Sequence, residues 1–395
     1  MTKTYKPRLI VYIVWHPAYK DGQEYAEFLY SLLTRNVKQP VSRGLGIPVF
    51  FRNVVSRDTD RPLEIKLEDA QQSAVVVLVD DAMVASEDGW NTYLHNLWRQ
   101  TKDTASSHRL YPISMTPNAF NLDAIAETNF IRLHNLEPDK RRAVLAGNLI
   151  HELCRLMLNQ NRATKQQTTP LSPAPVKLFI SHAKQDGKQL ANDIRAYMHR
   201  DLALKTFFDA TDIAPGYLFA DEIDANLEDA ALLIILTDSY ASRPWCRREV
   251  IKAKQLGCPM IVVNAIKKGE ERSFPYLGNI PTVRWNPSPV QNNSDLCEAE
   301  MQTTINLTLR EVLKNVYLKQ HFKNLTNLFL EPPNALFFSR PPELMTLLHV
   351  KHATLNRENR LLYPDPPLGD EELNLLSQFA PELQLITPIL LGRQI

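Results

Sequence analysis

The chain of 395 residues has little of the chemistry on which metalloproteins and disulfide-linked proteins depend. Its four cysteines, Cys154, Cys246, Cys258 and Cys297, are scattered and form no CxxC pair, and its ten histidines show no HExxH spacing. Zinc sites and disulfide frameworks need clustered ligands or regularly spaced thiols. The sequence therefore predicts neither a metal centre nor a disulfide scaffold.

Strong net charge and long apolar runs are also missing. The net charge is +1, from 45 basic and 44 acidic residues, whereas direct nucleic-acid binding needs concentrated positive charge. No apolar run reaches the roughly 18 residues that span a bilayer. The apolar stretch 9–15 is followed at once by His16 and Pro17, which makes a poor signal peptide. We expect a cytoplasmic protein with no membrane or nucleic-acid partner.

A glycine-rich dinucleotide loop is absent as well. No GxGxxG occurs, and the "GLG" of residues 44–46 is only a turn fragment. Hydride-transfer enzymes hold their cofactor intact in a Rossmann site that uses such a loop. The sequence therefore disfavours a dehydrogenase.

Residues 162–175, "RATKQQTTPLSPAP", divide the sequence into two domain-sized parts. This segment has three prolines and no apolar periodicity, so it is predicted to be an extended linker. The length of the chain favours two to three domains. We predict one domain at 1–161, a second at 176–316 and a C-terminal extension or small domain at 317–395.

Strand and helix patterns alternate after the linker. "VKLFISH", "KTFFD", "ALLIILTDS" and "PMIVVNAI" read as strands, and "KQLANDIRAYMHR" and "SRPWCRREVIKAKQLG" as helices. For the second helix we predict Ser242 as N-cap, Pro244 in the first turn and Gly257 past its end. The alternation predicts an α/β fold, with a flavodoxin-like parallel sheet and helices on both faces.

The same order of features occurs upstream, in "LIVYIVWHP", "IPVFF", "AVVVLVDD" and "RLYPISM". Four landmarks recur: His16 with His182, Asp21-Gly22 with Asp186-Gly187, Phe50-Phe51 with Phe207-Phe208, and residues 67–70 with the identical residues 227–230. Their shared order predicts a duplicated fold. Beyond residue 317 proline-rich segments precede "LQLITPI", which reads as a last strand of an α/β or irregular extension.

Three segments resemble the Toll/interleukin-1 receptor (TIR) domain family. "LFISHAKQDG" is similar to its opening strand and loop, "FFDATDIAPG" to its second strand and following loop, and "LIILTDSYASRPWCRREV" to its third strand and W-C-x-x-E helix. Each motif is short, but the three occur in the family's order and spacing. The resemblance covers residues 176–285.

The resemblance to bacterial NAD-cleaving TIR defence proteins implies a catalytic role for Glu249, the glutamate of the W-C-x-x-E segment. It also implies these substrate-binding residues: Ser181, His182, Ala183, Phe207, Asp209, Gly216, Ser242, Trp245 and Cys246. His182 and Ala183 stand where some members carry arginine or tyrosine, so contacts to the phosphates or adenine are expected to differ. NAD is then a substrate, and no cofactor is implied.

One carboxylate suits this chemistry. Nicotinamide leaves as a neutral base, so the main barrier is the ribosyl cation, which a nearby carboxylate stabilises. Trp245 lies four residues before Glu249 and hence on the same helix face. An aromatic such as Trp245 or Phe207 can stack on the departing pyridine.

Each of these residues also has a structural interpretation. Glu249 can be a solvated carboxylate near a helix start, Trp245 a core residue and His182 a polar residue at a strand end. Ser181 and Ser242 can cap turns, and Cys246 and Cys258 can be small buried apolar residues. Arg247 and Arg248 can contact either the diphosphate or solvent. The loop 209–216 can be an ordinary turn or a lid.

Three functions remain open. The first is an NAD glycohydrolase that yields nicotinamide and ADP-ribose or a cyclic ADP-ribose, and that acts by self-association in antiphage defence, under a regulatory or sensor partner. The others are a non-catalytic TIR scaffold and a producer of a nucleotide messenger. In the upstream copy, Leu94 stands four residues after Trp90 and Arg52 at the position of Asp209. We predict that this copy is catalytically inactive and docks a partner or regulates the second.

Overall fold

The computed structural model describes residues 5–36, 38, 44–56, 62–86, 89–102, 107–163, 176–201, 208–209, 230–269, 274–285, 294–330, 335–348 and 360–392. The chain divides into two compact units, Met1–Ala174 and Pro175–Ile395. Most of the predicted linker lies outside the described residues, although Arg162 and Ala163 still belong to a helix. Within the described part, no helix is long and apolar enough to cross a membrane.

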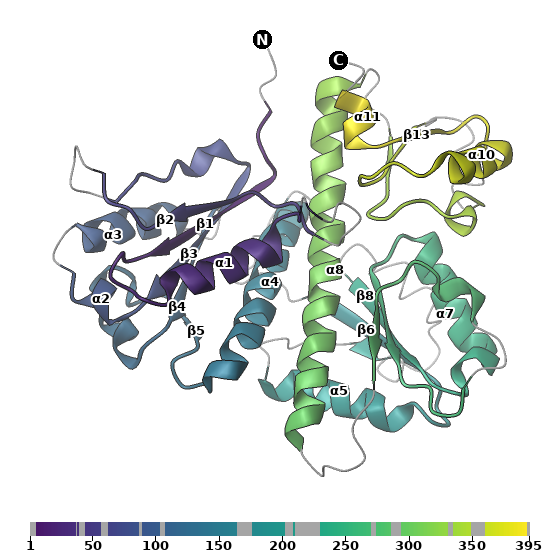
Figure 1. The fold of residues 1–395 in the computed structure, drawn as a ribbon, viewed down its shortest axis with the longest axis horizontal. Helices are drawn as coiled ribbons and strands as arrows, with labels where there is room; N and C mark the ends of the chain where they lie inside the picture. The colour runs from purple at the N-terminus through teal and green to yellow at the C-terminus, as the bar shows by residue number, and fades with distance from the viewer. Residues whose placement is uncertain are drawn as a thin grey trace. The chain divides into compact units, whose positions relative to one another are not determined.

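The first unit contains a parallel five-stranded sheet with the order β2-β1-β3-β4-β5 (Figure 1). Its strands are β1 Leu9–Trp15, β2 Val49–Arg52, β3 Gln72–Val79, β4 Arg109–Ser114 and β5 Ile131–Arg132. Its α-helices are α1 Gly22–Leu33, α2 Asp81–Val84, α3 Trp90–Thr101 and α4 Pro138–Ala163. β1 and β3 are buried along their whole length, as expected of central parallel strands with both faces covered.

The second unit repeats this topology. Its first sheet has the order β10-β9-β8-β6-β7, so the strands that follow one another along the chain occupy the same places as in the first unit. The strands are β6 Lys177–His182, β7 Phe208–Asp209, β8 Ala230–Leu236, β9 Met260–Asn264 and β10 Thr282–Arg284. All neighbours are parallel, which fits the predicted duplicated arrangement.

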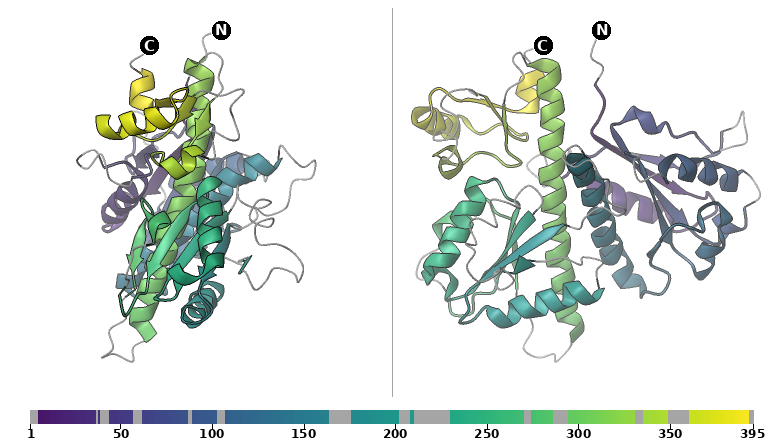
Figure 2. Two further views of the ribbon diagram at one scale, coloured as in Figure 1. Left: turned by 90° about the vertical axis from the view of Figure 1, so that its right-hand side faces the viewer. Right: turned by 180° about the vertical axis from the view of Figure 1, so that it is seen from behind.

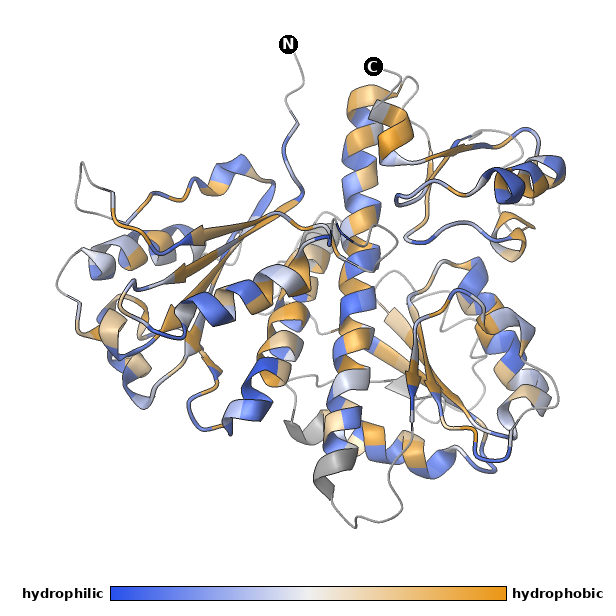
Figure 3. Ribbon diagram, viewed as in Figure 1, coloured by the Kyte–Doolittle hydropathy of each residue, from blue (hydrophilic) through white to orange (hydrophobic). Residues whose placement is uncertain are grey.

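Helices cover both faces of this second sheet. They are α5 Lys188–Asp201, α7 Pro244–Gln255 and α8 Ser294–Phe329. α7 packs on one face, and α8 lies on the other face against β8, β9 and α5 (Figure 1, Figure 2). The central strands are apolar along their length, whereas the helices alternate between polar and apolar residues (Figure 3). The predicted flavodoxin-like α/β fold is therefore confirmed.

The Asp-Gly landmark has the same structural reason in both units. α1 begins at Gly22, where a Cβ would lie 2.2 Å from Cδ1 of Trp15. α5 begins directly after Gly187, where a Cβ would lie 3.1 Å from the Ala183 oxygen and 3.2 Å from Cβ of His182. In each unit the first helix passes close to the end of the first strand, so that an added side chain would displace the Trp15 ring at Gly22 and would be crowded at Gly187.

The identical residues 67–70 and 227–230, in contrast, do not occupy equivalent places. With His16 matched to His182, Val11 corresponds to Lys177. Val11 pairs with Ala74 and Lys177 with Ala230, so the equivalent of Ala230 is Ala74 and not Ala70. Residues 227–229 lie outside the described part of the chain. The tetrapeptide identity is therefore displaced by four residues in the sheet register, and it does not support the duplication.

The predicted division between residues 316 and 317 falls inside α8, which runs unbroken from Ser294 to Phe329. Beyond it a small parallel sheet, β11-β12-β13, is formed by Leu336–Phe337, Arg360–Leu362 and Gln384–Ile386. α10 Asp370–Phe379 and α11 Pro388–Gly392 accompany this sheet. The extension is thus α/β rather than irregular, and the predicted last strand is confirmed as β13.

Candidate functional site

The candidate site lies at the carboxyl end of β6, where α7 begins on one face of the sheet (Figure 1). Parallel sheets of this kind bind their ligands at the carboxyl ends of the strands. Ser181 is the penultimate residue of β6, and Glu249 lies in the second turn of α7. Their exposed fractions are 2% and 4%, so the carboxylate lies inside the protein and needs a hydrogen-bond donor.

Ser181 is that donor. Its hydroxyl donates a short hydrogen bond to Oε2 of Glu249, and the same Oγ lies 2.6 Å from the hydroxyl of Tyr240. A serine has one proton to donate, so Tyr240 must donate to Ser181 while Ser181 donates to Glu249. The three side chains therefore form a directed chain that ends on the carboxylate.

Tyr240 is the residue that the sequence analysis missed. It begins the short 3₁₀ turn η5, Tyr240–Ser242, and its side chain is completely buried. Burial raises the pKa of Tyr240 well above its usual value and the charge of Glu249 raises it further, although the Ser181 hydrogen bond acts in the opposite direction. The phenol therefore stays protonated and keeps its role as donor. A tyrosine in a polar turn directly after a buried strand was the available signal, because buried hydroxyls usually find a partner.

The thiol of Cys246 is not an activated nucleophile. Burial, and then the negative charge of Glu249, raise its pKa to about 12. Its sulfur lies 3.7 Å from the carbonyl oxygen of His182, between the helix and the strand end. Cys246 and Cys258 are both buried within the apolar cluster under α7, which confirms the prediction of small core residues.

The start of α7 differs from the prediction. The N-cap position is Arg243, and no side chain caps it. Ser242 instead belongs to η5, where its hydroxyl donates to the carbonyl of Ser239 at 2.7 Å. The predicted cap was wrong because this turn intervenes between β8 and the helix. Pro244 does lie at the first helical position, and Gly257, at φ 63°, follows the helix end as predicted.

Trp245 lies on the surface rather than in the core. Its exposed fraction is 46%, although it stands only one turn before the buried Glu249. Arg248 is exposed, and Arg247 donates from Nε to the carbonyl of Ala241 at 2.6 Å. The Arg247 guanidinium therefore stabilises the turn that precedes the helix. Trp245 is the exposed aromatic residue of α7, and it lies one turn before Glu249.

The opening loop after β6 is tied to the turn after β8 by Asp186. Its carboxylate accepts hydrogen bonds from Oγ1 of Thr237 at 2.6 Å and from the amide of Ser239 at 2.9 Å. Burial alone would raise the pKa of Asp186, but these hydrogen bonds outweigh it and the net shift is downward. The loop that follows Ser181 and the turn that carries Tyr240 are therefore fixed to one another.

The other predicted site residues have different surroundings. The side chain of Ala183 belongs to the core, so only its backbone is placed near the site, whereas His182 is partly exposed at the strand end. Asp209 pairs in register with Ile180 at the edge of the sheet. Phe207 and Gly216 lie outside the described residues, as does the loop between Asp209 and Gly216. The predicted lid therefore remains a prediction.

The first unit has no carboxylate at the position of Glu249. In α3 the buried residues Trp90, Leu94 and Leu97 have the same spacing as Cys246, Val250 and Ala253 in α7. Glu249 thus corresponds to Tyr93 rather than to Leu94, and Trp90, which is fully buried, does not correspond to the exposed Trp245. With His16 matched to His182, as in the sheet register above, Trp15 stands at the place of Ser181.

The prediction that the first unit is catalytically inactive does not depend on this corrected alignment. Tyr93 donates from its hydroxyl to the carbonyl of Leu63 at 3.0 Å, and the buried indole of Trp15 packs edge-on against Phe51. Neither residue is an acid. Elsewhere in the described part of the chain, no group of three or more His, Cys, Asp or Glu residues could hold a metal ion.

Comparison with known proteins identifies the family of this site. No curated protein matches the chain. The family model described as "TIR domain" matches residues 178–305, from β6 to the first third of α8. The match includes Ser181, Tyr240 and Glu249, and it covers the sheet whose strand order was described above. Residues 178–305 of this chain are therefore a TIR domain.

Proposed function

We propose that the TIR domain cleaves the bond between nicotinamide and ribose in NAD, with Glu249 as the catalytic residue. The observation that carries this proposal is the hydrogen-bonded, buried carboxylate at the carboxyl end of β6. A carboxylate in a water-poor site stabilises a developing positive charge far more strongly than one in water. The exposed indole of Trp245, one turn earlier on the same helix, supports the proposal as a surface for the pyridine ring.

The chemistry requires only one such group. The carbon–nitrogen bond breaks with its electron pair on nicotinamide, which leaves neutral, and the positive charge remains on the ribose. Glu249 stabilises this cation and then accepts the proton of the attacking water, so that ADP-ribose is formed. If a nitrogen of the adenine attacks instead, the product is a cyclic ADP-ribose.

We further propose that the protein acts as a self-associating effector in bacterial antiphage defence, through loss of NAD. The small exposed fraction of Glu249 supports regulation, because a ribose ring needs more access to the carboxylate than 4% exposure provides. Contact with a second TIR domain would supply the movement that opens the site. The first unit would then serve as the docking surface for a regulatory or sensor protein.

A non-catalytic TIR scaffold is the second candidate. The burial of Glu249 and its hydrogen bond to Ser181 also fit this candidate, because a purely structural carboxylate has the same surroundings. In that case the domain binds other TIR domains and turns over no substrate. A nucleotide messenger, the third possibility, shares the first bond cleavage with the glycohydrolase and is distinguished by its product.

The deciding experiment measures NAD consumption by the full chain at high protein concentration. Glu249→Ala and Glu249→Gln are expected to lower kcat by at least about 10² to 10³-fold. Glu382→Gln makes the same chemical change at an exposed position and should leave kcat unchanged. An assembled, folded wild-type protein that leaves NAD intact would establish the scaffold, and chromatography of the products separates ADP-ribose from a cyclic product.

A further inference from the structure

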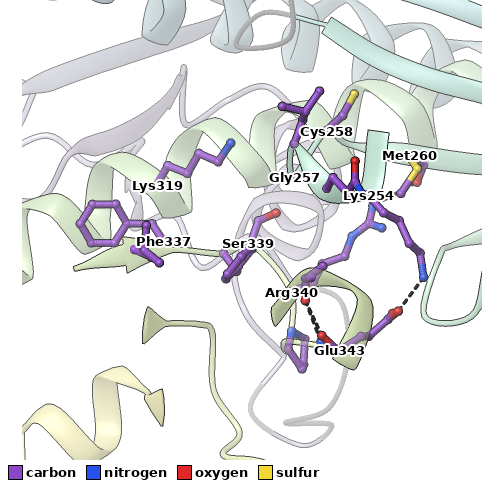
Figure 4. A pocket seen from close by; sticks show the side chains of 15 residues that line it. Lys254, Gly257, Cys258, Met260, Lys319, Phe337, Ser339, Arg340 and Glu343 are labelled. Atoms are coloured by element: carbon purple, nitrogen blue, oxygen red, sulfur yellow. Dashed lines mark hydrogen bonds and ion pairs between the residues drawn. The ribbon is translucent and has the colours of Figure 1, made fainter. Parts of the chain in front are cut away.

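The helix that carries Glu249 is held at its other end by the chain beyond the TIR domain. Lys254, in the last turn of α7, is only 6% exposed. Its ammonium group binds the carboxylate of Glu343 at 2.6 Å (Figure 4) and the carbonyl of Gly278 at 3.0 Å. Glu343 lies beyond residue 305, where the family match ends. A buried ammonium group needs such a partner, so the ion pair fixes the helix end to a segment outside the domain.

Two more side chains from beyond the family match bind the turn between α7 and β9. Asn315 of α8 donates from Nδ2 to the carbonyl of Gly257 at 3.0 Å and to Oγ of Ser339 at 2.9 Å. Arg340 donates to the carbonyl of Met260, the first residue of β9, at 3.1 Å. The turn that follows the helix is therefore bound by residues outside the matched segment.

Residues 339–346, which we call the latch, supply most of these groups. At its end, Oγ1 of Thr346 accepts a hydrogen bond from the amide of Glu343 at 2.9 Å and donates to the carbonyl of Glu343 at 2.7 Å. These bonds fix the backbone from which the Glu343 carboxylate reaches Lys254. The latch is tied to α8 as well, because Arg340 lies 3.4 Å from the carboxylate of Glu311.

The latch does not pack closely against the end of α7. A cavity of about 240 Å³ lies there, with residues 254–258 on one side and residues 336–341 on the other (Figure 4). Protein interiors contain few voids larger than a water molecule, so polar contacts rather than close packing hold this joint. Polar groups can exchange their protein partners for water at modest net cost. The latch can therefore separate from the helix without loss of a close-packed apolar contact.

The remaining contacts of α7 are few. Its buried residues are Cys246, Glu249, Val250, Ala253 and Lys254. The apolar ones are no larger than valine, and each charged one is bound by a side chain of another element: Glu249 by Ser181 and Lys254 by Glu343. The two charged residues lie roughly 8 Å apart along the helix axis, at about 1.5 Å per residue. Because the helix is internally hydrogen-bonded, a shift of its end at Lys254 also moves Glu249.

We propose that the latch is autoinhibitory: it holds α7 where Ser181 closes over Glu249, and its release opens the site. With the latch closed, Lys254 is paired and Glu249 is only 4% exposed. With the latch open, Lys254 and Glu343 are both hydrated, the helix end is free, and the carboxylate becomes accessible to a ribose. The inhibitory role rests on the proposed NAD cleavage, whereas the exposure of Glu249 can be measured without any reaction of NAD.

The first experiment measures this exposure in the full chain, by labelling carboxylates with a carbodiimide and an amine and identifying the labelled peptides by mass spectrometry. Glu343→Gln leaves Lys254 without its carboxylate and should raise the labelling rate of Glu249 at least about tenfold. Glu371→Gln makes the same chemical change at an exposed position of α10 and should leave that rate unchanged. Equal labelling of Glu249 in the two variants would overturn the proposal.

Hydrogen exchange separates a latch from general destabilisation. In Glu343→Gln the amides of α7 should exchange at least about tenfold faster, while those of β8 keep their wild-type rates. Equal acceleration in α7 and β8 would mean that Glu343 stabilises the whole domain, which refutes the latch. In the Lys254→Met background, adding Glu343→Gln should change the exchange of α7 less than about twofold, because no ammonium group is left unpaired. An undiminished effect in that background would also refute it.

Turnover of NAD tests the inhibitory role. If NAD is cleaved as proposed, Glu343→Gln should raise the specific activity at least about tenfold. Wild-type activity in a variant whose Glu249 is labelled faster would refute inhibition. If no protein cleaves NAD but labelling and exchange respond as expected, the proposed cleavage is refuted and control of Glu249 by the latch is supported.

Should Glu343→Gln fail to fold, hydrogen exchange of the wild-type protein decides the question. The amides of α7 and those of residues 344–347 should then open with the same free energy, which should be lower than that of β8. Protection of α7 equal to that of β8 would refute the latch.

Discussion

Ser181 lies between two groups with opposite needs. Glu249 needs a donor because its carboxylate is buried, and Tyr240 needs an acceptor because its phenol is buried. One hydroxyl satisfies both through the contacts to Glu249 and Tyr240. By hydrogen bonding, Tyr240 is connected to the carboxylate through Ser181, and this makes the contribution of that connection measurable.

If NAD is cleaved as proposed, Tyr240→Phe should lower kcat by about tenfold with little change in KM, because Ser181 loses the donor that orients it. Tyr240 is a positioning residue, so its effect must depend on Ser181. Adding Tyr240→Phe to Ser181→Ala should therefore change kcat by less than about twofold. Full additivity of the two effects in steady-state kinetics would show that Tyr240 acts by another route.

Asp186 predicts a pH dependence of stability. Its pKa is lower in the folded protein than the ordinary value of 3.8, so the charged form stabilises the fold above that pH. This contribution is lost as the pH falls through the lowered value. Asp186→Asn should reduce the Tm at pH 7, and the difference from wild type should shrink when Tm is measured below pH 3.8. A constant difference across this range would contradict the assignment.

At the scale of elements, the two sheets begin with the same strand-to-helix step. Gly22→Ala and Gly187→Ala should both destabilise their units, because each added methyl group meets existing atoms. The approach is closer at Gly22, 2.2 Å against 3.1 Å, so we expect a loss of about 2–3 kcal/mol there and about 1 kcal/mol at Gly187. Urea denaturation measures both, and the opposite ranking would show that the Trp15 ring moves aside easily.

The elements also show which features could be predicted from the sequence and which could not. Buried parallel strands such as β8 were predictable because their apolar runs need no knowledge of neighbours, and Pro244 and Gly257 marked the ends of α7 by backbone preference. Ser242 was misassigned because its hydrogen-bond partner, the Ser239 carbonyl, arises from a turn that no local pattern specifies. Tyr240 was missed because its contact with Ser181 joins residues 59 positions apart.

On the scale of the whole molecule, two units share one strand order but only the second has an acid at the equivalent helix position. If the first unit is regulatory, removal of residues 1–174 should leave basal NAD cleavage and change its dependence on protein concentration. Specific activity measured over a range of concentrations tests this. A folded truncated protein without any turnover would instead assign a catalytic role to the first unit.

The proposed self-association makes a further prediction for the full chain. If assembly opens the buried carboxylate as proposed, specific NAD-cleaving activity should rise with protein concentration, in parallel with the oligomer fraction seen by analytical ultracentrifugation. Activity that is strictly proportional to concentration in a monomeric protein would argue against assembly as the trigger.

The continuous helix α8 has a consequence for cooperativity. Its 36 residues extend for about 54 Å, and they contact the TIR sheet as well as β11 and α11 of the C-terminal part. If either part separated from α8, buried apolar side chains of the helix, such as Ile305 and Phe322, would become exposed. The second unit should therefore melt in a single calorimetric transition, and a core substitution such as Leu361→Ala in β12 should lower the melting temperature of the TIR sheet as well.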